Sequence, residues 1–152
     1  MLERRLERLA QMYVEEYGTD VRDLPGSGAA GGLAGALAAL GGSLVSGFDV
    51  VADEVDLHDR LARADVVITG EGHLDAQSFD GKVVGGVTAL ASAAGRPVHV
   101  IAGIVDDDVR LRVPTVALVD RFGAERALRE PAWCIEHAAL DVLRDAARDD
   151  GA

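Results

Sequence analysis

The spacing of apolar and polar residues divides the chain into helical and strand segments. Apolar residues recur every three or four positions from Leu2 to Tyr17 with charged residues between them, which predicts an amphipathic helix over residues 2–17 that ends at Gly18. Short β-branched runs predict strands, and longer periodic stretches predict helices. The further predicted strands are residues 48–51, 66–68, 98–103 and 115–119, and the further predicted helices are residues 34–40, 53–64, 83–94 and 132–148.

The order of these segments predicts the fold class. From residue 66 onward a strand is followed by a helix, a strand, a short link, a strand and a helix. This order predicts parallel strands joined by right-handed crossovers, hence an α/β fold with a small, mainly parallel sheet flanked by helices. Three or four strands would leave valine-rich sheet edges exposed, and proteins normally cover such edges. We therefore expect this sheet to pair with another copy or to belong to a larger fold.

Composition narrows the possible partners. The 152 residues carry a net charge of -11, so a nucleic acid would be repelled, although a small phosphate can still bind to local amides or a metal. No apolar run is long enough to span a membrane, and the charged N-terminus does not resemble a signal peptide. The single cysteine, Cys134, excludes an internal disulfide and a cysteine-based metal site. We expect a cytoplasmic protein that binds neither nucleic acid nor membrane.

Chemistry concentrates in residues 64–82, which read A-D-V-V-I-T-G-E-G-H-L-D-A-Q-S-F-D-G-K. The predicted strand breaks at Gly70 and Gly72 into a polar loop, and open α/β sheets bind ligands at the carboxyl ends of their strands. Glu71, Asp75 and Asp80 are hard oxygen ligands, and Lys82 can neutralise a phosphate at a helix start. This set suits magnesium-assisted phosphoryl transfer. The structural alternatives are that Glu71 caps the helix or pairs with Lys82, and that Asp75 and Asp80 belong only to turns.

A second glycine-rich stretch, P-G-S-G-A-A-G-G-L, occupies residues 25–33. Its spacing fits the dinucleotide fingerprint G-x-G-x-x-G, but that fingerprint must follow a buried strand, and residues 21–25 make a poor strand. Two interpretations are left. The turn opens a helix whose free N–H groups receive an anion, or the glycines let two backbones pack closely.

The glycine stretch, the motif I-T-G-E-G-H-L-D-A-Q-S-F-D-G-K at residues 68–82, and the later I-A-G and D-R-F-G segments resemble, in that order, the C-terminal part of the bacterial glycerate kinases. The resemblance covers nearly the whole chain. It implies ATP-dependent phosphorylation of glycerate at the 2-hydroxyl, with magnesium. It also implies a Rossmann-like sheet domain with a second domain inserted in it. Residues 1–52 would then be the end of the inserted domain, and residues 53–152 the C-terminal part of the sheet domain.

The resemblance also implies roles for individual residues, and the shared motif positions carry them over. The catalytic set is Glu71, Asp75 and Lys82, with Glu71 and Asp75 as magnesium ligands; the substrate-binding set is Gly70, Gly72, His73, Gln77 and Ser78; the anion-binding set is Gly26, Gly28, Gly31 and Gly32. His73 departs from the family pattern, in which many relatives carry arginine. Its positive charge is therefore conditional on pH.

The N-terminal half of the family, with its Asp-Ser-Phe-Lys-Gly-like loop and its Gly-Gly-Ser-Ala-Thr-rich segment, has no counterpart in these 152 residues. Half of the expected active site is then absent. Three interpretations stay open. The chain is a glycerate kinase whose activity needs completion, a non-catalytic module that binds a ligand or dimerises, or one subunit of a split kinase. The expected partners are a small hydroxy acid such as glycerate, and either a second copy or a complementing N-terminal half.

Overall fold

The computed structural model describes residues 1–149, which fall into two compact units. Met1–Ser46 forms the first, and the residues from Gly47 onward form the second. The domain boundary predicted after residue 52 stays a prediction, and the compact units divide after Ser46. The physical reason is that the Phe48 ring lies where a Cβ on Gly86 would stand, 2.5 Å away, which joins this segment to the second unit. That the first unit is part of an inserted domain stays a prediction.

The first unit is built from two helices. The predicted helix is confirmed as α1 (Leu2–Tyr17), and Gly18 ends it in the left-handed conformation with φ 70°. The second helix, α2 (Ala29–Ala39), begins earlier than residue 34, where the sequence placed it, and its opening turn is irregular. A small core joins the two helices; its buried residues are Ala10, Val21, Ala38 and Ala39, with Tyr13 and Leu44 packed against them.

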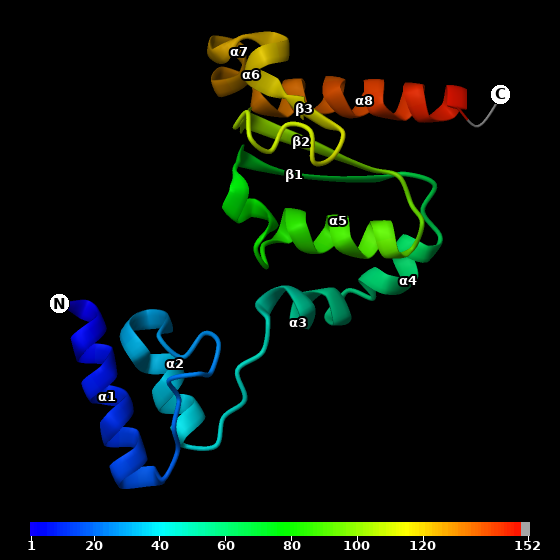
Figure 1. The fold of residues 1–152 in the computed structure, drawn as a ribbon. Coiled ribbons are helices and arrows are strands. Elements are labelled where there is room, and N and C mark those ends of the chain that lie inside the picture. Colours follow the sequence, from blue (N-terminus) through cyan, green and yellow to red (C-terminus); the bar gives the residue numbers. More distant parts are fainter. Residues whose placement is uncertain (150–152) are drawn as a thin grey trace. The chain divides into compact units, whose positions relative to one another are not determined.

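The second unit contains a parallel three-stranded sheet, as the order of segments predicts. Its strands are β1 (Val67–Leu74), β2 (Val98–Val105) and β3 (Thr115–Ala117), in the spatial order β1-β2-β3. Helix α5 (Val83–Ala93) covers one face and α8 (Pro131–Asp149) covers the other (Figure 1). The predicted fold class is confirmed. The two faces carry separate apolar cores, one including Val84, Ala91, Val100 and Ala102, the other including Ile101, Leu118, Cys134 and Ala138.

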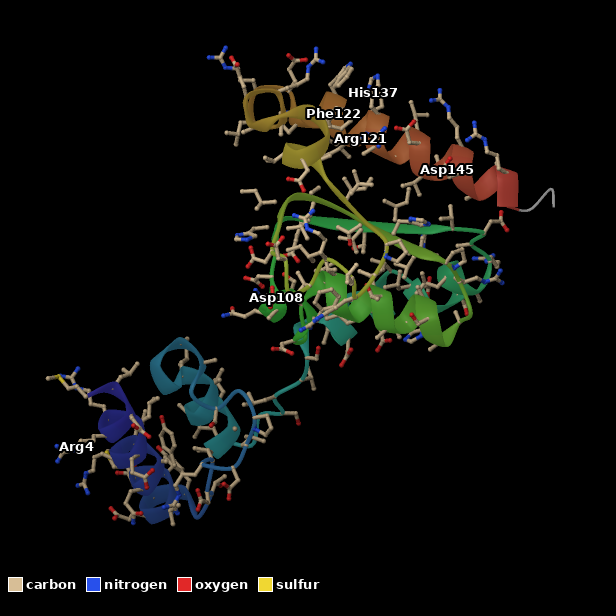
Figure 2. The ribbon with its side chains drawn as sticks, turned by 45° about the horizontal axis from the view of Figure 1, so that its top comes forward. Arg4, Asp108, Arg121, Phe122, His137 and Asp145 are labelled. Carbon is tan, nitrogen blue, oxygen red and sulfur yellow. The ribbon has the colours of Figure 1, made fainter. Side chains whose placement is uncertain are left out.

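Short helices connect these elements: α3 (Gly47–Glu54), α4 (Leu57–Ala62), the 3-10 helix η1 (Ala76–Phe79), α6 (Leu118–Phe122) and α7 (Ala124–Arg129). Contacts between aromatic side chains join helix α6 to the start of α8. Phe122 meets Trp133 edge to face at 5.5 Å, and Trp133 stacks on His137 at 3.7 Å. Figure 2 shows Arg121, Phe122 and His137 together at this end of the unit. Cys134 is fully buried here, as its apolar neighbours predict.

Several sequence-based predictions of local structure are wrong. Residues 48–51 are not a strand but part of helix α3. Tertiary contacts outweigh the β-branched Val-Val pair, because Ala52 of this helix is buried and Phe48 packs on Gly86. The single helix predicted over residues 53–64 is two helices, because Asp56 adopts φ 53° and interrupts it. No described helix is long and apolar enough to cross a membrane.

The predicted strands also change length. The strand at residues 66–68 runs on to Leu74, and the strand at residues 115–119 ends at Ala117, where α6 begins. Pairing with β2 decides where each of these two strands ends. Strand β1 pairs with β2 at every position from Val67 to Leu74 except Gly72, whereas β3 is paired at only three positions, Thr115, Val116 and Ala117. The extension of β1 brings Gly70, Glu71, Gly72 and His73 onto the sheet.

Candidate functional site

The first half of the predicted polar loop is in fact the carboxyl half of strand β1. Gly70 pairs with Ile101, and Glu71 pairs with Ala102, so the sheet continues through the two glycines. A Cβ at Gly70 would stand 2.1 Å from the Ile101 carbonyl oxygen, so glycine is required for this close approach. Gly72 has open space around it. The prediction of a loop here is wrong because the hydrogen-bonding partner lies about thirty residues away in the sequence.

Asp75 ends the strand and begins η1 through a reciprocal pair of hydrogen bonds. The Ser78 N–H donates to Asp75 Oδ1 at 2.9 Å, and the Asp75 N–H donates to Ser78 Oγ at 3.0 Å. Ser78 Oγ also lies 3.1 Å from Asp75 Oδ1, and Ser78 is fully buried. This arrangement is a capping box, so Asp75 has the turn role that the structural alternative assigned to it.

These contacts also keep Asp75 ionised. Burial raises its pKa, but the side-chain and backbone hydrogen bonds of Ser78, the charge of Lys82 and the backbone N–H of Gln77 together lower the pKa below its usual value. Gln77 is exposed on η1 and acts on Asp75 through its backbone. The structure therefore presents an anionic carboxylate, already oriented, at the end of β1.

His73 forms an ion pair across the end of the sheet. Its Nε2 lies 2.7 Å from Asp106 Oδ1, and both side chains are about half exposed, at 54% and 47%. The hydrogen bond to Asp106 raises the pKa of His73; partial burial opposes this shift, while the charges of Asp106, Asp75 and Glu71 add to it. These neighbours therefore favour the protonated, cationic form of His73, which lies among three carboxylates.

Asp106 was missed by the sequence analysis. It follows Val105, the last residue of β2, and neighbouring parallel strands end at the same edge of a sheet. The run Asp106-Asp107-Asp108 directly after an apolar strand was the signal that could have found it.

Glu71 and Lys82 line a common groove of about 590 Å³ beside β1, together with Gly70, Gly81 and apolar side chains of α3 and α5. Glu71 Oε1 is buried and has no hydrogen-bond partner among the described residues. An unpartnered buried carboxylate oxygen is costly unless a donor or a cation satisfies it. Lys82 stands at the N-cap of α5 and its charge reaches Asp75. The groove is thus lined by one carboxylate that has an unpartnered oxygen, Glu71, and by one lysine, Lys82.

The same features test whether magnesium fits. Over residues 1–149, no three His, Cys, Asp or Glu side chains form a group that could hold a metal ion. Magnesium commonly takes only one or two protein carboxylates and completes its shell with phosphate oxygens and water. Glu71, with its unpartnered oxygen, and the ionised Asp75 are hard ligands of that type. The residues present fit a magnesium site that a phosphate ligand completes.

In the first unit, the glycine stretch packs against α1. Gly31 and Gly32 have φ 70° and 95°, and a Cβ on Gly32 would lie 2.7 Å from Leu9 and 3.1 Å from Leu6. The Tyr13 hydroxyl donates to the Gly32 carbonyl at 3.4 Å. The close-packing interpretation is therefore supported at Gly32. Gly26 turns the chain with φ 85°, and a Cβ on Gly28 would make only ordinary contact with Leu6. Anion binding by these glycines stays a prediction.

The fold and the site define a class. A parallel sheet covered by helices on both faces, with acids and a lysine gathered at the carboxyl end of one strand, is typical of α/β proteins that bind a small ligand at that edge. The model of the glycerate kinase family matches residues 1–147, and the chain belongs to this family.

Individual relatives agree with this assignment. The chain is 42% identical over 109 residues to the glycerate 2-kinase of Escherichia coli K12, covering 71% of this chain and 29% of the relative. It is 32% identical over 144 residues to a glycerate kinase of Neisseria meningitidis serogroup B, covering 90% and 38%. A crystal structure named as glycerate kinase 2 from Salmonella typhimurium LT2 superposes with a TM-score of 0.51 at 37% identity, covering 73% and 29%. The chain thus spans less than a third of the length of the first relative.

Proposed function

We propose that this chain supplies one wall of the active site of a glycerate kinase, which transfers the γ-phosphoryl group of ATP to the 2-hydroxyl of glycerate. The observation that carries the proposal is the groove lined by both Lys82 and Glu71, whose Oε1 is buried without a partner, in a chain that the glycerate kinase family model matches over residues 1–147. Phosphoryl transfer depends on positioning and on neutralising charge, and a carboxylate and an ammonium group on rigid elements provide both.

Each charged residue has a distinct role in this proposal. Glu71 and Asp75 would hold magnesium, which when bound neutralises charge on the phosphates. Lys82 turns toward the transferred phosphate, and the adjacent N-terminus of α5 adds backbone N–H groups. The capping box fixes Asp75, since Ser78 leaves it little rotational freedom.

The remaining site residues bind substrate. Gly70 and Gly72 keep the strand free of side chains at the ligand, and Gln77 is exposed at the end of η1. His73 offers a positive charge to a carboxylate or phosphate while it is protonated. In the first unit, Gly26, Gly28, Gly31 and Gly32 would bind an anion through their backbone. The proposal also includes a cytoplasmic location, because the reaction consumes ATP.

A coupled assay of ADP release tests the proposal. The chain is combined with the part of Escherichia coli glycerate 2-kinase that lies outside the matched segment, and glycerate, ATP and magnesium are added. We expect turnover that falls at least about a hundredfold in Glu71→Gln and Lys82→Ala, since each removes a charge that stabilises the transition state. Arg129→Ala, on exposed helix α7, is the matched control and should leave the rate unchanged.

The position of the phosphate on the product, read by phosphorus NMR, separates the 2-hydroxyl from the other hydroxyl. The proposal is wrong if glycerate is not phosphorylated in the combined sample, or if Glu71→Gln and Lys82→Ala retain the rate of the unsubstituted chain. Omission of magnesium should stop turnover, because the negative carboxylates of Glu71 and Asp75 repel the phosphates unless a cation neutralises both.

A further inference from the structure

Asp106 joins the carboxyl ends of the two longest strands. It directly follows β2, and its backbone N–H donates to the carbonyl of Leu74, the last residue of β1, at 3.0 Å. Its side chain makes a second connection, because Asp106 Oδ1 lies 2.7 Å from His73 Nε2. A carboxylate only accepts hydrogen bonds, so the ring N–H of His73 is the donor. Two bonds to the neighbouring strand therefore fix where the Asp106 carboxylate lies.

Only one of the two carboxylate oxygens of Asp106 is used. Oδ1 accepts from His73, whereas Oδ2 has no hydrogen-bond partner within residues 1–149. The side chain is about half exposed, so a small solute can reach it. Asp106 therefore offers one acceptor that is held in place by its neighbours and is still free to bind a ligand.

The two arginines of the loop after β2 do not neutralise this oxygen. Arg110 is held elsewhere, by Asp120 at 2.6 Å and by Asp107 at 3.4 Å. The guanidinium group of Arg112 lies over the Phe79 ring, 5.2 Å from its centroid. Both cations of the loop thus have other partners, and the free oxygen is left to a hydrogen-bond donor from outside.

The position of Asp106 places this oxygen beside the groups proposed to transfer phosphate. Its partner His73 feels the charges of Asp75 and Glu71. Strands β1 and β2 are parallel, so their carboxyl ends lie at one edge of the sheet, where α/β proteins bind small ligands. A substrate whose reacting hydroxyl faces Glu71 and Asp75 therefore has Asp106 as a neighbour of its other groups.

The chemistry of glycerate decides which of its groups Asp106 can bind. Glycerate carries an acid group, the 2-hydroxyl and a further hydroxyl on carbon 3. Its acid group accepts hydrogen bonds and is negative, so it cannot bind to Asp106 and is repelled by it. The 2-hydroxyl is the group that takes the phosphate. The 3-hydroxyl is left, and it can donate a hydrogen bond.

We propose that Asp106 is a specificity-determining residue of this site, and that its Oδ2 accepts a hydrogen bond from the 3-hydroxyl of glycerate while His73 holds Oδ1. The substrate class is then a small 2-hydroxy acid with a second hydroxyl on the adjacent carbon. The inference rests on the proposed function, because it takes glycerate as the substrate. A hydrogen bond to a charged group should favour such a substrate by roughly tenfold to a hundredfold.

The specificity ratio between glycerate and lactate tests this role. Lactate has the same acid group and 2-hydroxyl but a methyl group in place of the CH2OH group. The chain is combined with the remaining part of Escherichia coli glycerate 2-kinase, and kcat/KM is measured for each acid. We expect a preference for glycerate of at least about tenfold. Asp106→Ala should lower kcat/KM for glycerate at least about tenfold, mainly through KM, and leave that for lactate within about threefold.

Two further variants separate recognition of the substrate from support of His73. Asp108→Ala removes a neighbouring exposed aspartate (Figure 2) and should leave both values of kcat/KM unchanged. His73→Gln keeps a side-chain donor for Asp106 Oδ1, so it should change the two substrates alike and preserve their ratio. The proposal is overturned if Asp106→Ala leaves the ratio unchanged, since equal losses for both acids would mean that Asp106 only supports His73.

A binding measurement decides the case in which the combined sample shows no turnover. Glycerate or lactate is added at equal concentration to the chain, and carbon NMR follows the carboxyl signals of Asp106 and Asp108. We expect glycerate, but not lactate, to shift the Asp106 signal, while the Asp108 signal stays in place. That result without turnover would count against the proposed phosphorylation and support recognition by Asp106. Equal responses to the two acids overturn the inference about Asp106.

Discussion

The two glycine-rich segments of this chain, residues 25–33 and residues 68–82, look alike in sequence but are built differently. In the first, positive φ angles at Gly31 and Gly32 bend the start of α2, and Leu6 and Leu9 pack where a side chain on Gly32 would stand. In the second, Gly70 and Gly72 lie in an extended strand, and polar side chains are fixed by specific hydrogen bonds. A glycine motif alone therefore identifies neither the backbone conformation nor the function.

The two segments also differ in which of them carries interacting charged side chains. The first segment packs against apolar side chains of α1, and the Tyr13 hydroxyl donates to the Gly32 carbonyl. In the second segment, the charges of Glu71 and Asp75 act on His73, and the charge of Lys82 acts on Asp75. We infer that the second segment is the centre of the functional site and that the first is mainly structural. The following substitutions test this contrast.

The largest effect is expected at Gly70. In Gly70→Ala the new methyl group would meet the Ile101 carbonyl, so β1 and β2 must separate locally, at a cost of about 3 kcal/mol in the free energy of unfolding. Gly72→Ala is the matched control, because nothing lies within 4 Å of its Cβ. Urea unfolding of both variants measures the difference. Equal stability of the two would contradict the close approach of the strands.

The second-largest loss of stability is expected for Gly32→Ala. Its φ of 95° strains any other residue, and its methyl group would overlap Leu9, so we expect a loss of about 2 kcal/mol in the stability of the first unit. Gly31→Ala shares the positive φ but meets open space, and should lose about half as much. Hydrogen exchange of α1 amides is the measurement, because it reports this unit separately. If both variants exchange alike, packing on Leu9 contributes nothing.

Ser78→Ala should have a smaller effect that is specific to the second segment. The substitution removes the hydroxyl half of the capping box and should cost about 1 kcal/mol. It also removes hydrogen bonds that lower the pKa of Asp75, so that pKa should rise. Because the folded-state pKa of Asp75 is depressed, its contribution to stability is present above the unfolded pKa and is lost as pH falls through the folded pKa. Carbon NMR of the Asp75 carboxyl group should show the shift, and an unchanged titration would argue against the cap.

The smallest effect on stability is expected at His73. Its pKa is raised by Asp106, so the pair stabilises the fold fully below the unfolded pKa of about 6.5, and the contribution is lost as pH rises through the folded pKa. Proton NMR titration should place the pKa of His73 above the usual value, and Asp106→Asn should lower it. A pKa of His73 that is unaffected by Asp106→Asn would show that the ion pair does not persist in solution.

How much of the fold and of the candidate site could be predicted from the sequence depends on how far apart in the chain the interacting residues lie. Periodicity was sufficient for α1, α5 and α8, and the order of segments was sufficient for a parallel sheet, because these depend on neighbours in the chain. It failed at residues 48–51, where β-branched residues form a helix because Phe48 finds a place on Gly86. Periodicity failed again at Gly70 and Gly72. The strand continues through these glycines because β2 pairs with Gly70 and with the residues on either side of Gly72.

The sequence by itself determined the family, the α/β class and the identity of Glu71, His73, Asp75 and Lys82 as the candidate chemistry, because motif and pattern are local properties. Only the tertiary structure showed that Glu71 is on a strand with an unpartnered oxygen, and that Asp106 pairs with His73 through one of its two carboxylate oxygens. These facts arise from contacts between residues far apart in the chain. Strand pairing creates such contacts, and no local pattern encodes them.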